Sequence, residues 1–308
     1  MRLIGAALVL ALGIAIGAGP LQRSSQARTD ELAAQKRKVA AKEHEIASLQ
    51  AREKYSASYA AATAPRLVRD ALKDKAVTVL ALPGADPSTV DGVRTMIAAA
   101  GGEVTATVTF APVLGKASSR QLVEALTSQM ATQAPDLDVP DTASGYQRLG
   151  LLLARAVGSD GDTNTPKTGY DEEAVGIVSG LETAGLITST QVSWRAALTI
   201  AVTGPAAANA DAAGENAIPT TILRSYASKT PLLVAGPASA GGDRGIIGAL
   251  REGGAVRGMS TVDTVEAVSG QVTAVLALAA LARGPSGDNW GGVGAVDGAV
   301  PPLSPPSS

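Results

Sequence analysis

The pattern of hydrophobic and polar positions divides this 308-residue chain into an apolar start, a polar helical segment and a longer mixed region. An uncharged apolar run covers residues 3–19. In the polar segment that follows, Leu32, Val39 and Ile46 lie one heptad apart, and Leu49 adds an apolar position on the second seam. Apolar residues at seven-residue spacing are typical of helices that pair with one another. The pattern therefore predicts a membrane helix followed by a coiled-coil stalk.

Residues 1–21 are expected to form an uncleaved transmembrane anchor. A helix of the 17 to 19 apolar residues spans roughly 26–28 Å, which just crosses a thin hydrocarbon core. A cleaved signal segment is the alternative, because Gly17, Ala18 and Gly19 are small residues of the kind that a signal peptidase accepts. Pro20 would directly follow the cut and hinder it, and this favours the anchor.

The large domain beyond the anchor is expected to be exported into the cell envelope. Basic residues are more numerous after the apolar run than before it, and the positive-inside rule taken literally would place the domain in the cytoplasm. Only Arg23 and Arg28 lie within ten residues of the run, however, so the count carries little weight. No second run of membrane length follows in the sequence, so the whole domain lies on one side.

Residues 22–64 form the expected stalk. The stretch 29–62 is rich in Ala, Glu, Lys and Gln and contains no Gly or Pro, and Pro65 is expected to end the helix. The second seam carries Gln35 and Lys42, so the coiled coil would be a weak one. We expect a homodimer or higher oligomer through this stalk. The alternative is a single amphipathic helix that lies on its own domain.

Residues 65–284 have the pattern of an α/β domain. A continuous apolar run at 76–82 predicts a buried strand, and a helix is expected over 88–100 with Ser88 as its N-cap. Residues 104–110 return to strand character. Strand, helix and strand joined by short turns form a βαβ unit, whose strands are parallel and covered by helices. The sequence therefore predicts a Rossmann-like layered domain with a mostly parallel sheet.

The other expected elements of this domain follow from the same periodicities. Helices are predicted at 119–132, 143–157, 172–186, 219–228, 243–252 and 270–283, and strands at 196–203 and 232–235. The remaining segment, 285–308, is rich in Gly, Pro and Ser and is expected to be a disordered tail.

Composition removes most catalytic and metal-binding chemistry. The chain has no cysteine and a single histidine, His44, in the stalk. Disulfides, thiol nucleophiles, Ser-His-Asp triads and nearly all histidine-ligated metal sites are thereby excluded. Residues 56–308 carry 17 basic and 23 acidic residues, and aromatics make up only 3% of the chain, so nucleic-acid binding is not expected. We expect no enzyme activity, no catalytic residues and no cofactor.

Two loops bear some likeness to ligand-binding loops. The loop 83–87 follows the first strand, where α/β folds place ligands, but it lacks the glycine pattern of a nucleotide or phosphate loop. A second loop has the spacing of a calcium loop at Asp160, Asp162, Asn164 and Asp171, but it lacks the required glycine at its sixth position. We therefore expect a structural turn in the first case and a solvated turn in the second.

Several short segments carry a resemblance that runs over nearly the whole chain in the same order. Besides the apolar N-terminus and the stalk, they are RLVRDAL at 66–72, GGEVTATV at 101–108, STVD at 260–263, VLAL at 275–278 and WGGVG at 290–294. Together they resemble the actinobacterial copper-transporter family typified by mycobacterial copper transport protein B. The resemblance implies an envelope protein linked to copper efflux and described as forming an outer-membrane pore. It also brings in corynebacterial relatives tied to cell-wall splitting and division.

Copper itself has few ligands in this sequence. Cu(I) prefers thiolate or thioether sulfur and Cu(II) prefers imidazole, whereas the chain offers one histidine and only four methionines, with no two of them close in sequence. We therefore expect no metal site and regard copper only as an ion that could be transported. Because the sequence has one apolar span and strands of the buried type, a pore would require oligomerisation.

Two functional hypotheses remain. The first is a membrane-anchored envelope protein of the copper-transporter family that acts in copper efflux and homeostasis, as an oligomer. The alternative is a non-catalytic coiled-coil scaffold that binds a partner protein in cell-wall remodelling or division.

Overall fold

The computed structural model describes residues 24–134, 137–159, 167–190, 192–208, 212–284, 287–294 and 296–302. The chain separates into two compact units, Met1–Ser56 and Ala57–Ser308. The anchor expected over residues 1–21 lies outside the described residues. Among the helices of the described part, none combines the length and the apolar character that a membrane span requires.

The expected stalk is helical. Helix α1 (Ser24–Leu67) runs for 44 residues and continues through Pro65, so the prediction that Pro65 ends the helix is wrong by one half-turn. A proline so close to the end of a helix removes few backbone hydrogen bonds, and the next turn is held by Val68 N–H, which donates to the carbonyl of Ala64 at 3.1 Å. The helix is thus confirmed, while its pairing stays a prediction.

The second unit is built on a mixed, mostly parallel sheet with the strand order β4-β2-β1-β6-β7-β8-β9. Six strands are parallel to their neighbours, and β4 alone is antiparallel, against β2. The strands are β1 (Ala76–Ala81), β2 (Glu103–Phe110), β4 (Ile187–Ser189), β6 (Leu198–Val202), β7 (Leu232–Ala235), β8 (Met259–Val262) and β9 (Asn289–Trp290). A separate antiparallel pair joins β3 (Lys167–Thr168) and β5 (Arg195–Ala196).

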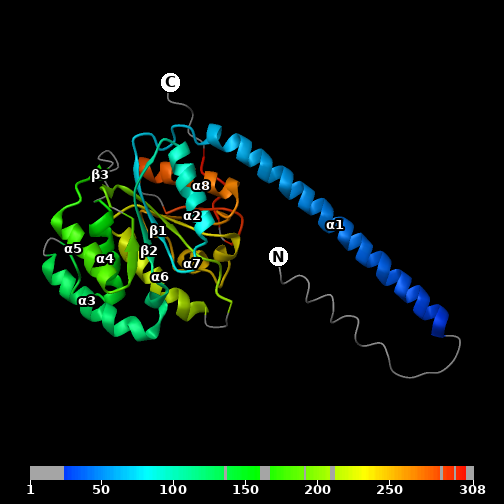
Figure 1. Ribbon diagram of the computed structural model, residues 1–308, viewed down its shortest axis with the longest axis horizontal. Coiled ribbons are helices and arrows are strands. Elements are labelled where there is room, and N and C mark those ends of the chain that lie inside the picture. Colours follow the sequence, from blue (N-terminus) through cyan, green and yellow to red (C-terminus); the bar gives the residue numbers. More distant parts are fainter. Residues whose placement is uncertain are drawn as a thin grey trace. The chain divides into compact units, whose positions relative to one another are not determined.

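Helices cover both faces of this sheet (Figure 1). One face packs on α2 (Pro87–Ala99), α8 (Val268–Arg283) and the end of α1, and the other packs on the remaining helices. These are α3 (Arg120–Gln133), α4 (Gly145–Val157), α5 (Glu172–Thr183), α6 (Ala212–Ala227) and α7 (Ile246–Glu252). The predicted α/β domain with a mostly parallel sheet is therefore confirmed.

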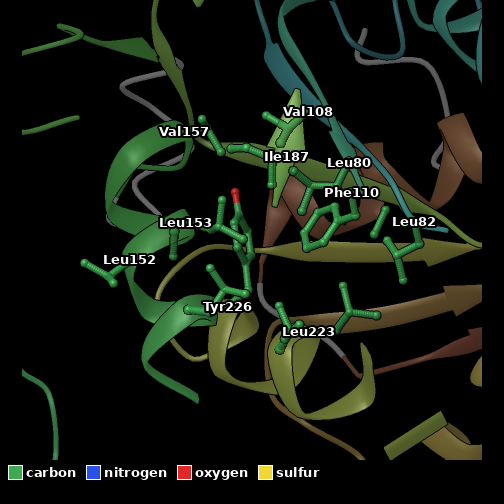
Figure 2. Packing of buried hydrophobic residues seen from close by; sticks show 14 of the residues in the cluster. Leu80, Leu82, Val108, Phe110, Leu152, Leu153, Val157, Ile187, Leu223 and Tyr226 are labelled. Carbon is green, nitrogen blue, oxygen red and sulfur yellow. The ribbon is translucent and has the colours of Figure 1, made fainter. Parts of the chain in front are cut away.

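The core is aliphatic, as the low aromatic content requires. Alternate residues of β1 point to opposite faces, so that Leu80 joins the cluster under α3–α7 while Val79 joins the cluster under α2 and α8. The largest fully buried side chain is Tyr226 of α6, which lies among Leu153, Val157 and their neighbours (Figure 2). Its hydroxyl group is 2.8 Å from Thr199 Oγ1, which satisfies both groups inside the core.

Several element boundaries differ from those predicted. Asp86, rather than Ser88, caps α2, because its carboxylate accepts the N–H of Thr89 at 3.1 Å. Helix α6 begins at Ala212 and contains Pro219, so the burial of its apolar face overrides the preference of proline for a helix start. The tail expected to be disordered from residue 285 instead contributes β9, in which Trp290 is buried against β8. Strands β4 and β8 were also not predicted, since β4 has only three residues and β8 (MSTV) lacks the continuous apolar run of β7 (LLVA).

Candidate functional site

The strand order creates a switch point between β1 and β6. From β1 the chain crosses to β2 on one side, whereas β6 lies on the other side and continues away through β7 and β8. In open α/β sheets such a point leaves a crevice at the carboxyl ends of the strands, where ligands bind. The crevice is closed at its base by contact between Gly84 and Gly204: a Cβ atom at Gly204 would lie 2.7 Å from the carbonyl carbon of Gly84.

The loop 83–87 at this crevice acts as a structural turn. Gly84 has a φ of +82°, a left-handed conformation that glycine adopts at little cost. Asp86 then caps α2. The hydrogen bonds that its carboxylate accepts hold the pKa of the carboxyl group below its usual value, and the bond from the Ser88 hydroxyl group contributes most. The side chain of Asp86 is thus committed to the helix start, in agreement with the predicted turn.

A cavity of about 290 Å³ opens at the carboxyl ends of β1, β2 and β6. Its walls come from the ends of these strands, the short helix η2 (Pro112–Gly115), α6 and the start of α7. The apolar lining residues are Leu82, Pro83, Phe110, Pro112, Leu114, Pro205, Ala207, Ile218, Pro219, Ile222, Leu223 and Ile246. Leu82, Phe110 and Leu223 lie close together in the core view (Figure 2). The polar side chains of the lining are Lys116, Glu215 and Asn216.

A second hollow adjoins this cavity and shares Gly115, Glu215 and Ile218 with it. At its edge Glu124 accepts the N–H of Gly145 at 2.7 Å and forms an ion pair with Arg148. These contacts lower the pKa of Glu124, and the hydrogen bond from the backbone N–H of Gly145 contributes most. The carboxylate therefore anchors the start of α4 to α3 and is not free to serve as a ligand for a substrate.

A buried ion pair ties the C-terminal segment to the sheet. Asp263 follows β8 and is fully buried, and its Oδ2 atom accepts from Arg251 Nη1 at 3.0 Å. The Asp263 carboxylate also accepts the N–H groups of Gly292, at 2.7 Å, and of Val293, at 3.2 Å. Arg251 in turn donates to Thr261 Oγ1 at 2.9 Å and to two carbonyl groups of the C-terminal segment. The charges are thus fully engaged, and the arrangement is a structural latch.

The latch was not recognised in the sequence. Its two halves, Arg251 and Asp263, lie at the end of α7 and after β8, and no motif links them. A signal was nevertheless present: an aspartate directly after an apolar run, and a glycine-rich segment at 291–294 that leaves room for it. Gly291 has a φ of +134°, and a Cβ atom there would lie 2.2 Å from Asp263 Oδ1.

Asp171 of the expected turn at 160–171 has a structural role. Residues 160–166 lie outside the described residues, whereas Asp171 caps α5 by accepting the N–H of Ala174 at 2.9 Å. Partial burial raises the pKa of Asp171, but the hydrogen bonds from Arg155 and Ala174 and the charge of Arg155 outweigh it and lower the pKa overall. Arg155 also pairs with Glu173 at 3.0 Å.

Copper ligands are scarce in the structure. Within the described residues, no group of three or more His, Cys, Asp and Glu side chains could hold a metal ion. Met96, Met130 and Met259 are buried, the first on one face of the sheet and the other two on the opposite face. His44 is exposed on α1, in the first unit. The thioether groups are therefore packing groups and do not converge on a site.

Comparison with known proteins places the chain among copper transport proteins. The family described as "Copper transport outer membrane protein, MctB" matches residues 1–301. The proteins named Copper transporter MctB from Mycobacterium bovis and from Mycobacterium tuberculosis are each 27% identical to this chain over 289 residues. These alignments cover 90% of this chain and 89% of each relative.

Proposed function

The chain belongs to the MctB family of copper transport outer membrane proteins, and on that premise we propose that it removes copper at the cell envelope as an anchored oligomer. The family supports a role in copper homeostasis. The anchor rests on the apolar run at 3–19, and the oligomer rests on α1. The proposal assigns no enzymatic activity to the chain.

The scarcity of ligands bears on how copper would be handled. A protein that stores or buffers copper needs a converging set of sulfur or imidazole groups, and the described residues contain no cluster of that kind. A protein that supports export can instead expose copper only to weak, exchanging ligands such as carboxylates and carbonyl groups. We therefore propose that copper is a cargo and that this chain holds no resident copper ion.

The exposed seam of α1 is the observation that carries the oligomer. Val39, Ile46 and Leu49 are 56%, 53% and 55% exposed, although they occupy three of the four core positions between residues 39 and 49, the fourth being Lys42. Burial of such positions against the same seam of a second copy would remove them from water. Single exposed apolar residues are ordinary on protein surfaces, but their regular spacing is not.

Charges beside the seam fit a parallel pair of helices in register. With Val39 at position a, Lys38 occupies g and Glu43 occupies the following e, so that Lys38 of one copy would face Glu43 of the other. Lys42, at a core position, pairs with Glu45 of its own helix at 2.7 Å, and this reduces the cost of a charge at the seam. The resulting pair would be weak, because polar residues interrupt the seam.

The test combines oligomeric state with copper content. Cell-associated copper is measured under copper load in a deletion strain that carries the wild-type gene, the Val39→Asp/Ile46→Asp variant, or the control Ala40→Asp/Ala47→Asp. The control adds the same two charges to the same helix at positions off the seam. The mass of each purified full-length protein is measured in detergent by light scattering.

We expect the wild type and the control to be oligomeric and to restore low copper, and the seam variant to be monomeric and to leave copper high. Copper that is unchanged by the deletion would overturn the efflux role. A seam variant of unchanged mass would overturn the oligomer.

Exposed Ser128 allows a topology test in this cysteine-free chain. The residue is changed to cysteine, and its reaction with a membrane-impermeant maleimide is compared in intact and lysed cells. A Ser128→Cys variant that reacts only after lysis would contradict export of the domain.

A scaffold is the second candidate function, and the same seam favours it. In this case α1 would present its apolar positions to a partner protein in cell-wall remodelling or division. Deletion would then leave cell copper unchanged and cause septation or wall defects, and the seam variant would reproduce those defects while the control would not.

A further inference from the structure

We propose that the cavity at the carboxyl ends of β1, β2 and β6 is a binding site for a small organic carboxylate with an apolar body. The site is separate from the copper role proposed above and from the seam of α1. Four observations carry it: the place of the cavity in the fold, its apolar wall, an unpaired lysine and a buried amide.

The cavity lies where the fold itself provides a ligand site. Strands β1 and β6 are paired neighbours, but the chain leaves β1 toward α2 on one face of the sheet and leaves β6 toward α6 on the other. The two loops that follow these strands contact each other at Gly84 and Gly204. The volume of about 290 Å³ is close to the lower end of the range typical of small-molecule sites. A ligand of this size would have about the bulk of one aromatic or branched aliphatic group with a short polar end.

The wall is apolar and held in place by the core. Leu82, Phe110, Leu114 and Leu223 are at most 4% exposed, so each is fixed by packing on its far side. Pro112, Pro205 and Pro219 also line the cavity, and their ring-restricted backbone limits collapse of the loops around them. A preformed apolar wall favours a ligand with an apolar body over a fully polar one.

Lys116 sets the charge of the ligand. It follows η2 directly, lies exposed in the lining of the cavity, and makes no ion pair or side-chain hydrogen bond in the part of the chain that the structure describes. A carboxylate at this exposed edge would accept a charge-assisted hydrogen bond from the ammonium group. Glu215, which has interactions of its own, is the other charged residue of the lining. With Lys116 as the basic group of the lining, the cavity favours a ligand with a single carboxylate.

Asn216 adds a second polar group. The residue is 6% exposed, and its Nδ2 group donates to the carbonyl of Arg244 at 3.2 Å. Within the described residues its Oδ1 atom has no hydrogen-bond donor. An N–H or hydroxyl group on the ligand would fill that role. An N-acylated apolar amino acid combines the three features: an apolar body, one carboxylate and an N–H group.

The experiment uses the full-length protein in detergent and N-acetyl-L-phenylalanine as the probe, with its C-terminal amide as the uncharged control. Binding is measured by isothermal titration calorimetry and by ligand-observed NMR. Lys116→Gln removes the charge. Gly115→Leu adds a side chain to the lining, where a Cβ atom meets no atom within 4 Å. Gly176→Leu makes the same change at an exposed position of α5 that also has open space around it.

We expect the probe to bind the wild type and Gly176→Leu equally. Lys116→Gln should weaken binding by about tenfold, in keeping with the loss of a charge-assisted hydrogen bond, and Gly115→Leu should weaken it at least as much. Absence of binding at millimolar probe, or equal binding by Gly115→Leu and Gly176→Leu, would overturn the site. Equal binding of the probe and its amide would overturn the carboxylate assignment. Copper content of the cells is a separate measurement, so failure here leaves the copper proposal untouched.

Discussion

Replacement of Asp263 should destabilise the α/β unit more than most single substitutions. Asp263 is fully buried and its partner Arg251 is 4% exposed, so an Asp263→Leu variant leaves a guanidinium group in the interior without a counter-charge. The N–H groups of Gly292 and Val293 lose their acceptor at the same time. Breaking a buried ion pair from one side costs about 3–5 kcal/mol. For a unit of this size that loss corresponds to a fall in Tm of roughly 6–20 °C.

Trp290 fluorescence can report on unfolding and on release of the C-terminal segment in one experiment. Trp290 is buried beside the latch and Trp194 is 41% exposed, so a Trp194→Phe background leaves one reporter at the C-terminal segment. Urea unfolding followed by Trp290 fluorescence and by circular dichroism then gives the free energy of unfolding. In the folded Asp263→Leu variant we also expect red-shifted Trp290 emission, because the segment at 290–294 is released toward solvent.

A double-substitution cycle isolates the charge. Arg251→Met with Asp263→Leu removes both charges and leaves apolar side chains of similar length, so the double variant should be more stable than Asp263→Leu by at least about 1 kcal/mol. Two results would refute the reasoning. One is an Asp263→Leu variant that loses less than about 1 kcal/mol, and the other is a double variant as unstable as the sum of the two single changes.

Two further predictions concern titratable groups. Burial raises the pKa of Tyr226, so the stability that its neutral form contributes is fully present below the unfolded pKa, about 10, and is lost as pH rises toward the folded pKa. A Tyr226→Phe variant should lose about 1 kcal/mol of unfolding free energy at neutral pH, because the hydrogen bond to Thr199 is gone. Its unfolding free energy should also depend less on pH in the alkaline range than that of the wild type. The pKa of Asp171 is lowered, so the stability that its carboxylate contributes is present above the unfolded pKa, about 3.9, and is lost as pH falls through the folded pKa. An Asp171→Asn variant should therefore have a lower Tm than the wild type at pH 7. The difference in Tm between the two proteins should become smaller below pH 4. Equal acid profiles of the two proteins would count against this role of Asp171.

The parts of the fold that the sequence predicted are those with a strong local period. Residues 76–110 contain a buried strand, an amphipathic helix and a partly buried strand, and their pattern alone predicts the βαβ unit. Strands β4 and β9 have only three and two residues and show no period, and β8 (MSTV) lacks the continuous apolar run that predicted β7 (LLVA). They form because β2, β7 and β8 offer unpaired edges to chain segments that lie farther along the sequence. Such pairing depends on the whole sheet and cannot be read from a local window.

Prediction of the candidate sites from the sequence was limited for the same reason. The turn at 83–87 was predictable because proline and glycine act locally. The cavity above it draws its wall from β1, β2, α6 and α7, and the stretch of chain from β1 to α7 is more than 150 residues long. The apolar residues of that wall are indistinguishable in sequence from ordinary core residues. The prolines at 112 and 205, each shortly after a strand, were the available signal, since they mark rigid loops at the carboxyl edge of the sheet.

The segments that carry the family resemblance meet in pairs in the fold. The segment 66–72 packs against the start of 101–108, because a Cβ atom at Gly102 would lie 3.1 Å from Leu72 Cβ. Directly before that segment, the carbonyl of Ala100 accepts Leu72 N–H at 2.9 Å. The segment 260–263 is joined to 290–294 through the latch.

These contacts are all packing and hydrogen-bonding contacts that fix the sheet and its edges. The segments quoted for the resemblance thus contribute to the packing and the edges of the sheet. Under the proposed copper-efflux role, we expect a variant at Asp263 to weaken export through loss of the fold. We expect a variant on the exposed seam of α1 to weaken export while the fold is retained. Measuring both cell copper and the free energy of unfolding for the two variants separates an effect on the fold from an effect on copper handling.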